Sequence, residues 1–248
     1  MPSSPTDTRT PLPRRLKDLV PEEVRECLDR DPRLIVPVGT CEQHGPHLPL
    51  GCDTTIVELL ADDLSAEFGV LRAPTVEYGV NTETDRDAPG NASLRRRTLL
   101  RLLNDLIDSW EADGVQEFIL LTAHGHVGHQ EALATVVTKG ARVRVVDIFS
   151  VRIDDLLTSQ KEALHGDEAD TSLMLYLAPH LVRMELAEDY TIASAAERRF
   201  RRKSLRIPST TSGSIGSPSV ASAEKGCAIY ARIRDKVRER IFLTPAVD

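Results

Sequence analysis

The 248-residue chain has little of what marks several large classes of protein. Its four cysteines form no CxxC pair and no regular framework (Cys27, Cys41, Cys52 and Cys227). They predict no disulfide scaffold, and reduced thiols in a cytoplasmic protein are the expectation. No run approaches the roughly 18 apolar residues that a membrane span needs. No apolar segment follows the first charges, as it would in a signal peptide.

An excess of positive charge is missing too. Lysine and arginine number 31 against 38 aspartates and glutamates, which gives a formal net charge of −7. This balance argues against nucleic acid or an anionic membrane as the main partner. The one strongly basic run, residues 197–206, could contact an anionic substrate, although a solvated surface is the more ordinary interpretation.

What the sequence does contain is a repeated alternation of short apolar runs and longer amphipathic stretches. The runs predict strands in residues 33–39, 69–79, 116–125 and 142–150, and the stretches predict helices in residues 19–31, 53–69, 95–114, 128–141, 172–178 and 221–241. This alternation predicts an α/β fold, a single-domain three-layer sandwich with a mostly parallel central sheet flanked by helices.

The composition of the chain changes in two places. Residues 1–15 are rich in proline, serine and threonine, and we expect a flexible N-terminal arm there, with residues 16–248 forming the folded domain. Residues 194–219 are polar and basic, with glycine and serine towards the end, and are predicted to form a long surface loop.

The stretch EQHGPHLPLGCD follows the strand at 33–39 and leads into the helix at 53–69. Loops of this kind, at the carboxyl ends of strands, are where open α/β sheets bind ligands. Glu42, His44 and Asp53 combine carboxylate and imidazole groups, a good ligand set for Zn²⁺, Mn²⁺ or Fe²⁺. A satisfied polar pair, with Asp53 as a helix cap, is the alternative. His47 is interpreted as a positioning residue.

Two further clusters follow later in the chain. HGHVGH carries His124, His126 and His129 directly after the most apolar strand, and HGDEADTS, residues 165–172, precedes an apolar helix. The acidic residues of the second cluster could simply complement a helix N-terminus. Taken together, the three clusters favour a site with two divalent metal ions and a separate acid or base.

These segments resemble the motifs of the creatininase family of metal-dependent amidohydrolases. EQHGPHLPLGCDT is similar to the family's signature loop, HGHVGH to its NGHGGN segment, and HGDEADTS to its HAGExETS segment. GSIGSPSVASAEKG resembles the family's late glycine-rich stretch. The resemblance covers nearly everything except the arm. It implies an α/β sandwich, assembly as a homo-oligomer, typically a hexamer, and two divalent metal ions that share a bridging aspartate and a water.

Carried over residue by residue, the resemblance implies a ligand set. Glu42 and His126 would bind the first metal, His44 the second, and Asp53 would bridge them. Some members have an acidic second-metal ligand two residues after the motif histidine, a position occupied here by Gly128. Glu168 is the natural substitute for that ligand.

The resemblance also implies a reaction, the hydrolysis of a C–N bond in a small-molecule amide, cyclic amide or formamide. Glu168 or Asp170 would take the proton of the attacking water, and His165 would pass it to the leaving nitrogen.

Several positions depart from the family motifs and leave the substrate open. His124 and His129 stand where the motif has asparagine, and Asp170 replaces a glutamate. Aromatic residues make up only 4% of the chain, so an aromatic-walled pocket for creatinine is hard to assemble. Cleavage of a ribosomally made cofactor precursor, as in some relatives, is one alternative. A metal-stabilised binding subunit without activity is another.

Overall fold

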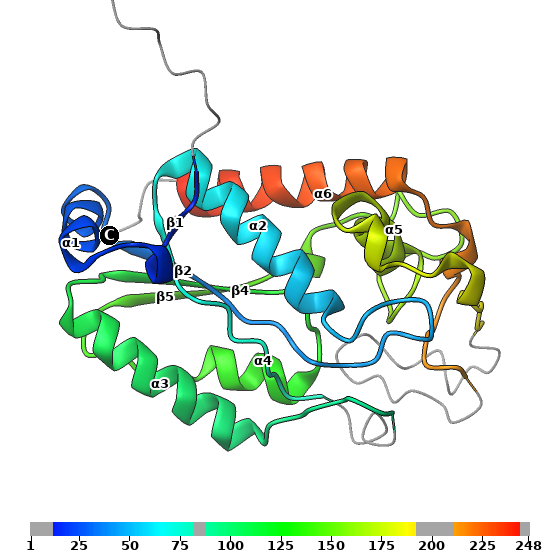
Figure 1. The fold of residues 1–248 in the computed structure, drawn as a ribbon, viewed down its shortest axis with the longest axis horizontal. Coiled ribbons are helices and arrows are strands. Elements are labelled where there is room, and N and C mark those ends of the chain that lie inside the picture. The colour runs from blue at the N-terminus through cyan, green and yellow to red at the C-terminus, as the bar shows by residue number, and fades with distance from the viewer. Residues whose placement is uncertain (1–11, 82–87, 192–210, 244–248) are drawn as a thin grey trace, which may run out of the picture.

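The computed structural model describes residues 12–81, 88–191 and 211–243. Within these ranges the strands form one parallel five-stranded sheet in the order β1-β3-β2-β4-β5 (Figure 1). The strands are β1 (Arg14–Arg15), β2 (Arg33–Pro37), β3 (Leu71–Arg72), β4 (Glu117–Thr122) and β5 (Arg142–Asp147).

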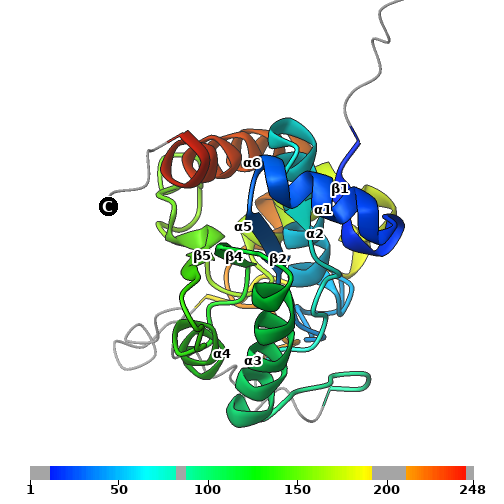
Figure 2. The same cartoon turned by 90° about the vertical axis from the view of Figure 1, so that its left-hand side faces the viewer.

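The helices lie on both faces of this sheet. They are α1 (Pro21–Arg30), α2 (Cys52–Phe68), α3 (Arg96–Ala112), α4 (Val127–Ala134), α5 (Glu168–Leu177) and α6 (Ala223–Val237), with a π-helical turn after α6 (Arg238–Leu243). Short 3-10 helices are η1 (Leu16–Asp18), η3 (Ile148–Ser150), η4 (Pro179–Leu181), η5 (Met184–Leu186) and η8 (Pro218–Val220). Figures 1 and 2 show α2 and α6 on one side of the sheet and α3 and α4 on the other.

Alternating side chains of the central strands build a separate core on each face. In β2, Ile35 packs with α2, α5 and α6, whereas Leu34 and Val36 pack with α1, α3 and α4. In β4, Ile119 points to the first core and Phe118 to the second. Strands that are buried on both faces have continuous apolar sequences, so β2 and β4 could be predicted from the sequence. The predicted three-layer α/β sandwich is confirmed.

The differences from the sequence expectations lie at the ends of elements. β3 is much shorter than the predicted strand at 69–79, and α2 begins at Cys52 with Gly51 as its N-cap. Of the predicted arm, residues 1–11 lie outside the described residues, while Arg14 and Arg15 pair with β3. Most of the predicted loop at 194–219 also lies outside the described residues. None of the described helices is long and apolar enough to cross a membrane.

The connection from β2 to α2 is held tightly against the sheet. Thr54 donates a hydrogen bond from Oγ1 to the carbonyl of Thr40 at 2.9 Å. A Cβ atom on Gly39 would lie 2.2 Å from Thr54 Oγ1, so only glycine allows this close approach. Because all strands are parallel, their carboxyl ends meet at one edge, and this connection starts there.

Candidate metal centre

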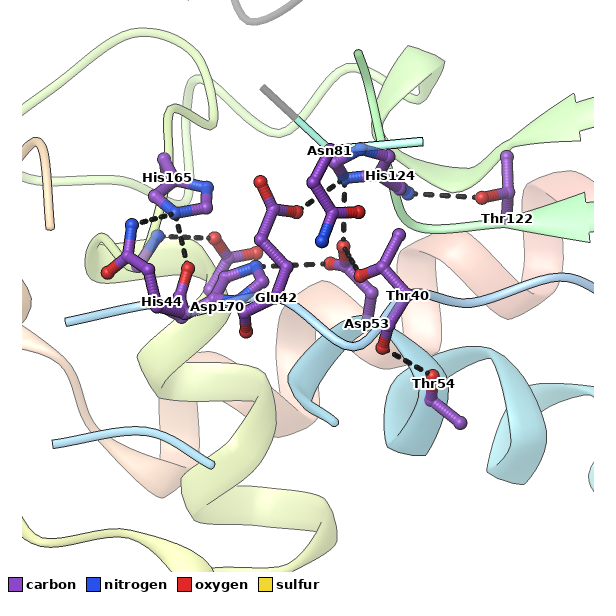
Figure 3. Close-up of polar contacts among 12 residues, drawn as sticks. Thr40, Glu42, His44, Asp53, Thr54, Asn81, Thr122, His124, His165 and Asp170 are labelled. Carbon is purple, nitrogen blue, oxygen red and sulfur yellow. Dashed lines mark hydrogen bonds and ion pairs between the residues drawn. The ribbon is translucent and has the colours of Figure 1, made fainter. Parts of the chain in front are cut away.

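Glu42, His44 and Asp53, the predicted ligands of the signature loop, come together in the structure. All three side chains are buried. Asp53 lies in the first turn of α2, and its Oδ2 accepts a hydrogen bond from Thr40 Oγ1 at 3.0 Å. Its Oδ1 lies 3.4 Å from His44 Nε2 (Figure 3). Asp53 is therefore not the helix cap, and its carboxylate faces the other groups of the loop.

His124 joins this cluster from the end of β4. Its Nδ1 lies 2.9 Å from Glu42 Oε2 and 3.1 Å from Asp53 Oδ2, and its Nε2 lies 3.0 Å from the carbonyl oxygen of Val80. A carbonyl only accepts, so Nε2 carries a proton and donates it to Val80. Without metal, Nδ1 also carries a proton and donates it towards the two carboxylates. A divalent ion could take the place of that proton, because metal-ligating imidazoles are commonly anchored by a backbone carbonyl on the other ring nitrogen.

Among the residues that the structure describes, two groups of histidine and acidic side chains have ligand atoms within 4.8 Å of one another, and both groups contain Glu42. One group is Glu42, Asp53 and His124, and the other is Glu42, His44 and His165. In the second group the rings of His44 and His165 are stacked, with centroids 4.3 Å apart and planes at 27°. The Nε2 atom of His165 also lies 2.7 Å from the carbonyl oxygen of Gln43, which only accepts, so this nitrogen is engaged as a donor. His165 is thus better placed as a neighbour of a metal site than as a ligand.

The two buried carboxylates of the cluster, Glu42 and Asp53, favour positive charge on the groups around them. Burial lowers the pKa of His44, but Asp53 and then Glu42 outweigh burial and raise it to about 9. The pKa of His124 likewise lies well above its usual value, because Glu42 and Asp53 outweigh burial. Burial disfavours the charged form of Asp53, yet His44 and His124 hold its pKa well below the usual range. Burial raises the pKa of Glu42.

A divalent cation fits this arrangement. The Oδ1 atom of Asp53 is fully buried and makes no hydrogen bond, so part of the carboxylate is available to an ion. Carboxylate oxygens and imidazole nitrogens are the donors that Zn²⁺, Mn²⁺ and Fe²⁺ accept. Buried carboxylates of this kind are stable only when paired or coordinated to a metal.

Glu168, predicted as a metal ligand and as a base, is placed differently. It is the first residue of α5, fully buried, and belongs to neither group. Its carboxylate accepts hydrogen bonds from the backbone and hydroxyl groups of Thr158 and Ser159 and forms a 2.6 Å ion pair with Lys225. Burial raises the pKa of Glu168, but Lys225, Ser159 and Thr158 together lower it to about 2. Both oxygens of Glu168 already accept hydrogen bonds from other residues of the protein, so this carboxylate has a structural role.

His126, the other predicted ligand, lies close to the cluster but in neither group. It occupies the N-cap position of α4, is half-buried, and its ring centroid is 6.0 Å from that of His124. His129, further along, is fully buried between the hydroxyl of Thr122 at 3.1 Å and the amide of Val80 at 3.3 Å. Burial keeps the pKa of His129 well below its usual value, so it is a neutral structural residue.

The HGDEADTS segment is fixed against the signature loop by its backbone. A Cβ atom on Gly166 would lie 2.4 Å from the carbonyl oxygen of His44, so the two segments are in direct contact. Asp170 Oδ2 accepts a hydrogen bond from Gly166 N at 2.8 Å. The side chain of Asp167 accepts from Ala169 N and Asp170 N and caps α5. Asp170 is thereby held next to the backbone that carries His165.

His47 is buried on the same loop, with its Nε2 2.8 Å from Thr171 Oγ1. Burial, followed by the charge of His44, lowers the pKa of His47 to about 4.

Two residues of the site were not predicted from the sequence: His124 as a member of the cluster, and Lys225 as the partner of Glu168. His124 is the first histidine after the end of β4 at Thr122, and this position next to the strand could have indicated that it lies in the cluster.

Comparisons with known proteins identify the family and agree with the fold. The creatininase (creatinine amidohydrolase) family model matches residues 17–241. A mycofactocin precursor peptide peptidase of Mycolicibacterium smegmatis is 29% identical, over 85% of this chain and 84% of the relative. A creatinine amidohydrolase of Pseudomonas putida is 27% identical over 83% and 88%. A solved creatininase mutant complexed with creatine has a TM-score of 0.76 at 22% identity, over 92% and 98% of the two chains.

The family model spans nearly the whole chain, and the solved neighbour shares its fold. The cluster of Glu42, His44, Asp53 and His124 occupies the edge of the sheet where such a fold binds ligands. The chain belongs to the creatininase family and is a hydrolase of that family.

Proposed function

We propose that the protein hydrolyses a C–N bond in an amide, cyclic amide or formamide at a centre of two divalent metal ions. The observation that carries this proposal is the orientation of Asp53. Its Oδ1 lies 3.4 Å from His44 Nε2, and its Oδ2 lies 3.1 Å from His124 Nδ1. A carboxylate that faces two different imidazoles is suited to bridge two ions, one with Glu42 and His124 and the other with His44.

We assign His126 to the second ion, together with His44. In some members of the family, an acidic ligand of the second metal lies two residues after the motif histidine, and here an imidazole would take its place. Because His124 takes the place of that histidine next to the carboxylates, the position two residues later is His126 and not Gly128. The engaged carboxylate of Glu168 supports no such role.

Divalent ions held there would activate a shared water and polarise the carbonyl of the substrate. Zn²⁺, Mn²⁺ and Fe²⁺ suit the donor set. Among the similar solved structures, one is described as a Zn-Zn creatininase and another as a Mn creatininase, with TM-scores of 0.76 and 0.74.

The remaining groups supply proton transfer. Asp170, held by its bond to Gly166 N, is the carboxylate we assign to take the proton of the attacking water. His165, stacked on His44, is assigned to deliver that proton to the leaving nitrogen. An imidazole can accept a proton on one step of a reaction and release it on the next.

The test compares metal content and hydrolysis in substituted proteins. Asp53→Ala is expected to lose both ions and all activity, whereas His124→Asn and His126→Asn should each lose one ion. Metal is counted by elemental analysis after loading with Zn²⁺ or Mn²⁺, and activity is measured on a panel of amides, lactams and formamides. Full metal content in Asp53→Ala would disprove the bridging role.

Cleavage of a short peptide is the second candidate function. It is favoured by the mycofactocin precursor peptide peptidases, of which the one from Mycolicibacterium smegmatis is 29% identical over most of both chains. Adding short peptides to the same panel separates this activity from hydrolysis of small amides. Assembly as a homo-oligomer remains a prediction, and sedimentation analysis would test it.

A further inference from the structure

Asn81 lies beside the metal cluster with a fixed amide orientation. Its Nδ2 donates to the carbonyl of Cys41 at 2.9 Å, and its backbone N donates to Ser93 Oγ at 3.0 Å. A carbonyl oxygen cannot donate, so the amide nitrogen must be the atom that faces Cys41. The amide oxygen, Oδ1, therefore points away from Cys41.

Two residues next to Asn81 are tied to proposed ligands of the metal centre. Cys41 directly precedes Glu42 in the chain, and Val80, which precedes Asn81, accepts the hydrogen bond from His124 Nε2 at 3.0 Å. Figure 3 shows the amide of Asn81 next to the Glu42 side chain and the His124 ring. The amide is thus positioned by the same backbone segments that position two proposed ligands.

The Oδ1 atom of Asn81 is buried and makes no hydrogen bond within the described residues. The residue as a whole is 6% exposed, so water does not readily reach the amide. The Oδ1 atom of Asp53, in the same cluster, is also buried and without a hydrogen bond. Native proteins rarely leave buried acceptors unsatisfied, and two such oxygens on segments of one buried cluster indicate a binding site for a cation.

We infer that Asn81 Oδ1 is an additional ligand of the metal ion that Glu42, Asp53 and His124 bind, an inference that rests on the proposed metal centre. The first metal position then has three oxygen donors and one imidazole nitrogen. Carboxylate and carbonyl oxygens suit Mn²⁺, whereas imidazole suits Zn²⁺. Asn81 therefore raises the affinity of this position for Mn²⁺ more than for Zn²⁺.

Two substitutions isolate the contribution of the amide oxygen. Asn81→Leu and Asn81→Asp both remove the hydrogen bond from Nδ2 to Cys41, but only aspartate keeps an oxygen in the place of Oδ1. Ser93→Ala serves as the control, because it removes the hydrogen bond to the Asn81 backbone and leaves the amide in place. Circular dichroism checks folding, and Asn81→Ala replaces Asn81→Leu if the leucine variant does not fold.

The dissociation constants of Mn²⁺ and Zn²⁺ are measured on metal-free protein by competition with a chelator, and the electron paramagnetic resonance spectrum of bound Mn²⁺ reports its ligands. Asn81→Leu is expected to weaken Mn²⁺ binding by about tenfold or more and Zn²⁺ binding by less. Asn81→Asp is expected to keep Mn²⁺ binding, and Ser93→Ala to match the wild type in both constants and in the spectrum.

Equal losses of Mn²⁺ affinity in Asn81→Leu and Asn81→Asp would overturn the inference, because the amide nitrogen would then account for the effect. Equal changes for Mn²⁺ and Zn²⁺ in Asn81→Leu would overturn it too. If the wild-type protein binds neither ion, the proposed metal centre fails with it. If all variants bind both ions as the wild type does, only the role of Asn81 is refuted.

Discussion

Asp53 and Glu168 are both fully buried carboxylates, and the chain treats them in opposite ways. Glu168 receives hydrogen bonds on both oxygens from Thr158 and Ser159 and an ion pair from Lys225. Asp53 Oδ2 meets Thr40 and His124, whereas its Oδ1 makes no hydrogen bond and has His44 Nε2 as a neighbour at 3.4 Å. Glu168 has hydrogen-bond donors on both oxygens and therefore stabilises the fold. Asp53 has them on one oxygen, which leaves the other able to bind an ion.

The difference has a consequence for stability. Glu168 lies at the start of α5 and connects it to residues 158–159 by hydrogen bonds and to the start of α6 by the ion pair with Lys225. Lys225 also donates to the carbonyl of Val220 in η8 at 2.6 Å. Glu168 should therefore stabilise the protein to the same extent with and without metal, whereas Asp53 should carry the additional stabilisation that metal binding provides. Four predictions test this contrast.

The largest effect is expected for Lys225→Met. The substitution leaves the carboxylate of Glu168 buried without its counter-ion, which costs about 3–5 kcal/mol. Urea unfolding of the metal-free protein measures this loss of unfolding free energy. Zn²⁺ affinity, measured on the folded fraction, should stay unchanged, since Lys225 contacts none of the proposed ligands. A variant as stable as the wild type would contradict the structural role of the ion pair.

Asp53→Asn should remove the stabilisation that metal provides. Free metal at 100 times its dissociation constant stabilises a folded protein by about 2.7 kcal/mol. The wild type should therefore unfold at a higher temperature with Zn²⁺ than with a chelator, and Asp53→Asn should show no such shift. Glu168→Gln is the matched control and should keep the shift. A metal-dependent rise in Tm that survives in Asp53→Asn would show that the ion binds elsewhere.

The sequence predicted the layers of the fold and the loop of the site because both depend on local patterns. Apolar runs buried on both faces define β2 and β4, and the signature loop between β2 and α2 carries Glu42, His44 and Asp53. Whether one of several nearby histidines reaches the carboxylates depends on where β4 ends. Motif spacing alone favoured His126, and the structure places His124 in the cluster.

The partner of Glu168 could not be predicted for another reason. Lys225 lies 57 residues away in the sequence and meets Glu168 only because α5 packs on α6. That packing depends on Gly226, where a Cβ atom would lie 1.9 Å from the carbonyl oxygen of Ser172. Long-range contacts of this kind follow from the assembled fold and leave no local pattern.

Glu168→Gln should give a smaller and pH-dependent loss. The folded-state pKa of Glu168 is about 2, below its ordinary value of 4.5. The ionised carboxylate therefore contributes stability above pH 4.5, and this contribution falls as the pH drops from 4.5 towards 2. At neutral pH we expect a loss of about 2 kcal/mol in the metal-free protein. Unfolding curves of both proteins between neutral pH and pH 3 measure the difference, and a loss that does not shrink in acid would refute the assignment.

Lys236→Met is expected to have the smallest effect, and it separates burial from charge pairing. Lys236 lies on α6, as Lys225 does, and pairs with Glu239 at 2.7 Å, but the two side chains are 46% and 56% exposed. Water already solvates both charges, so removing one partner costs about 0.5 kcal/mol or less. Urea unfolding under the conditions used for Lys225→Met gives the comparison. If both lysine variants lost the same free energy, the stabilisation would come from having a lysine on α6, and the donors gathered around Glu168 would not explain it.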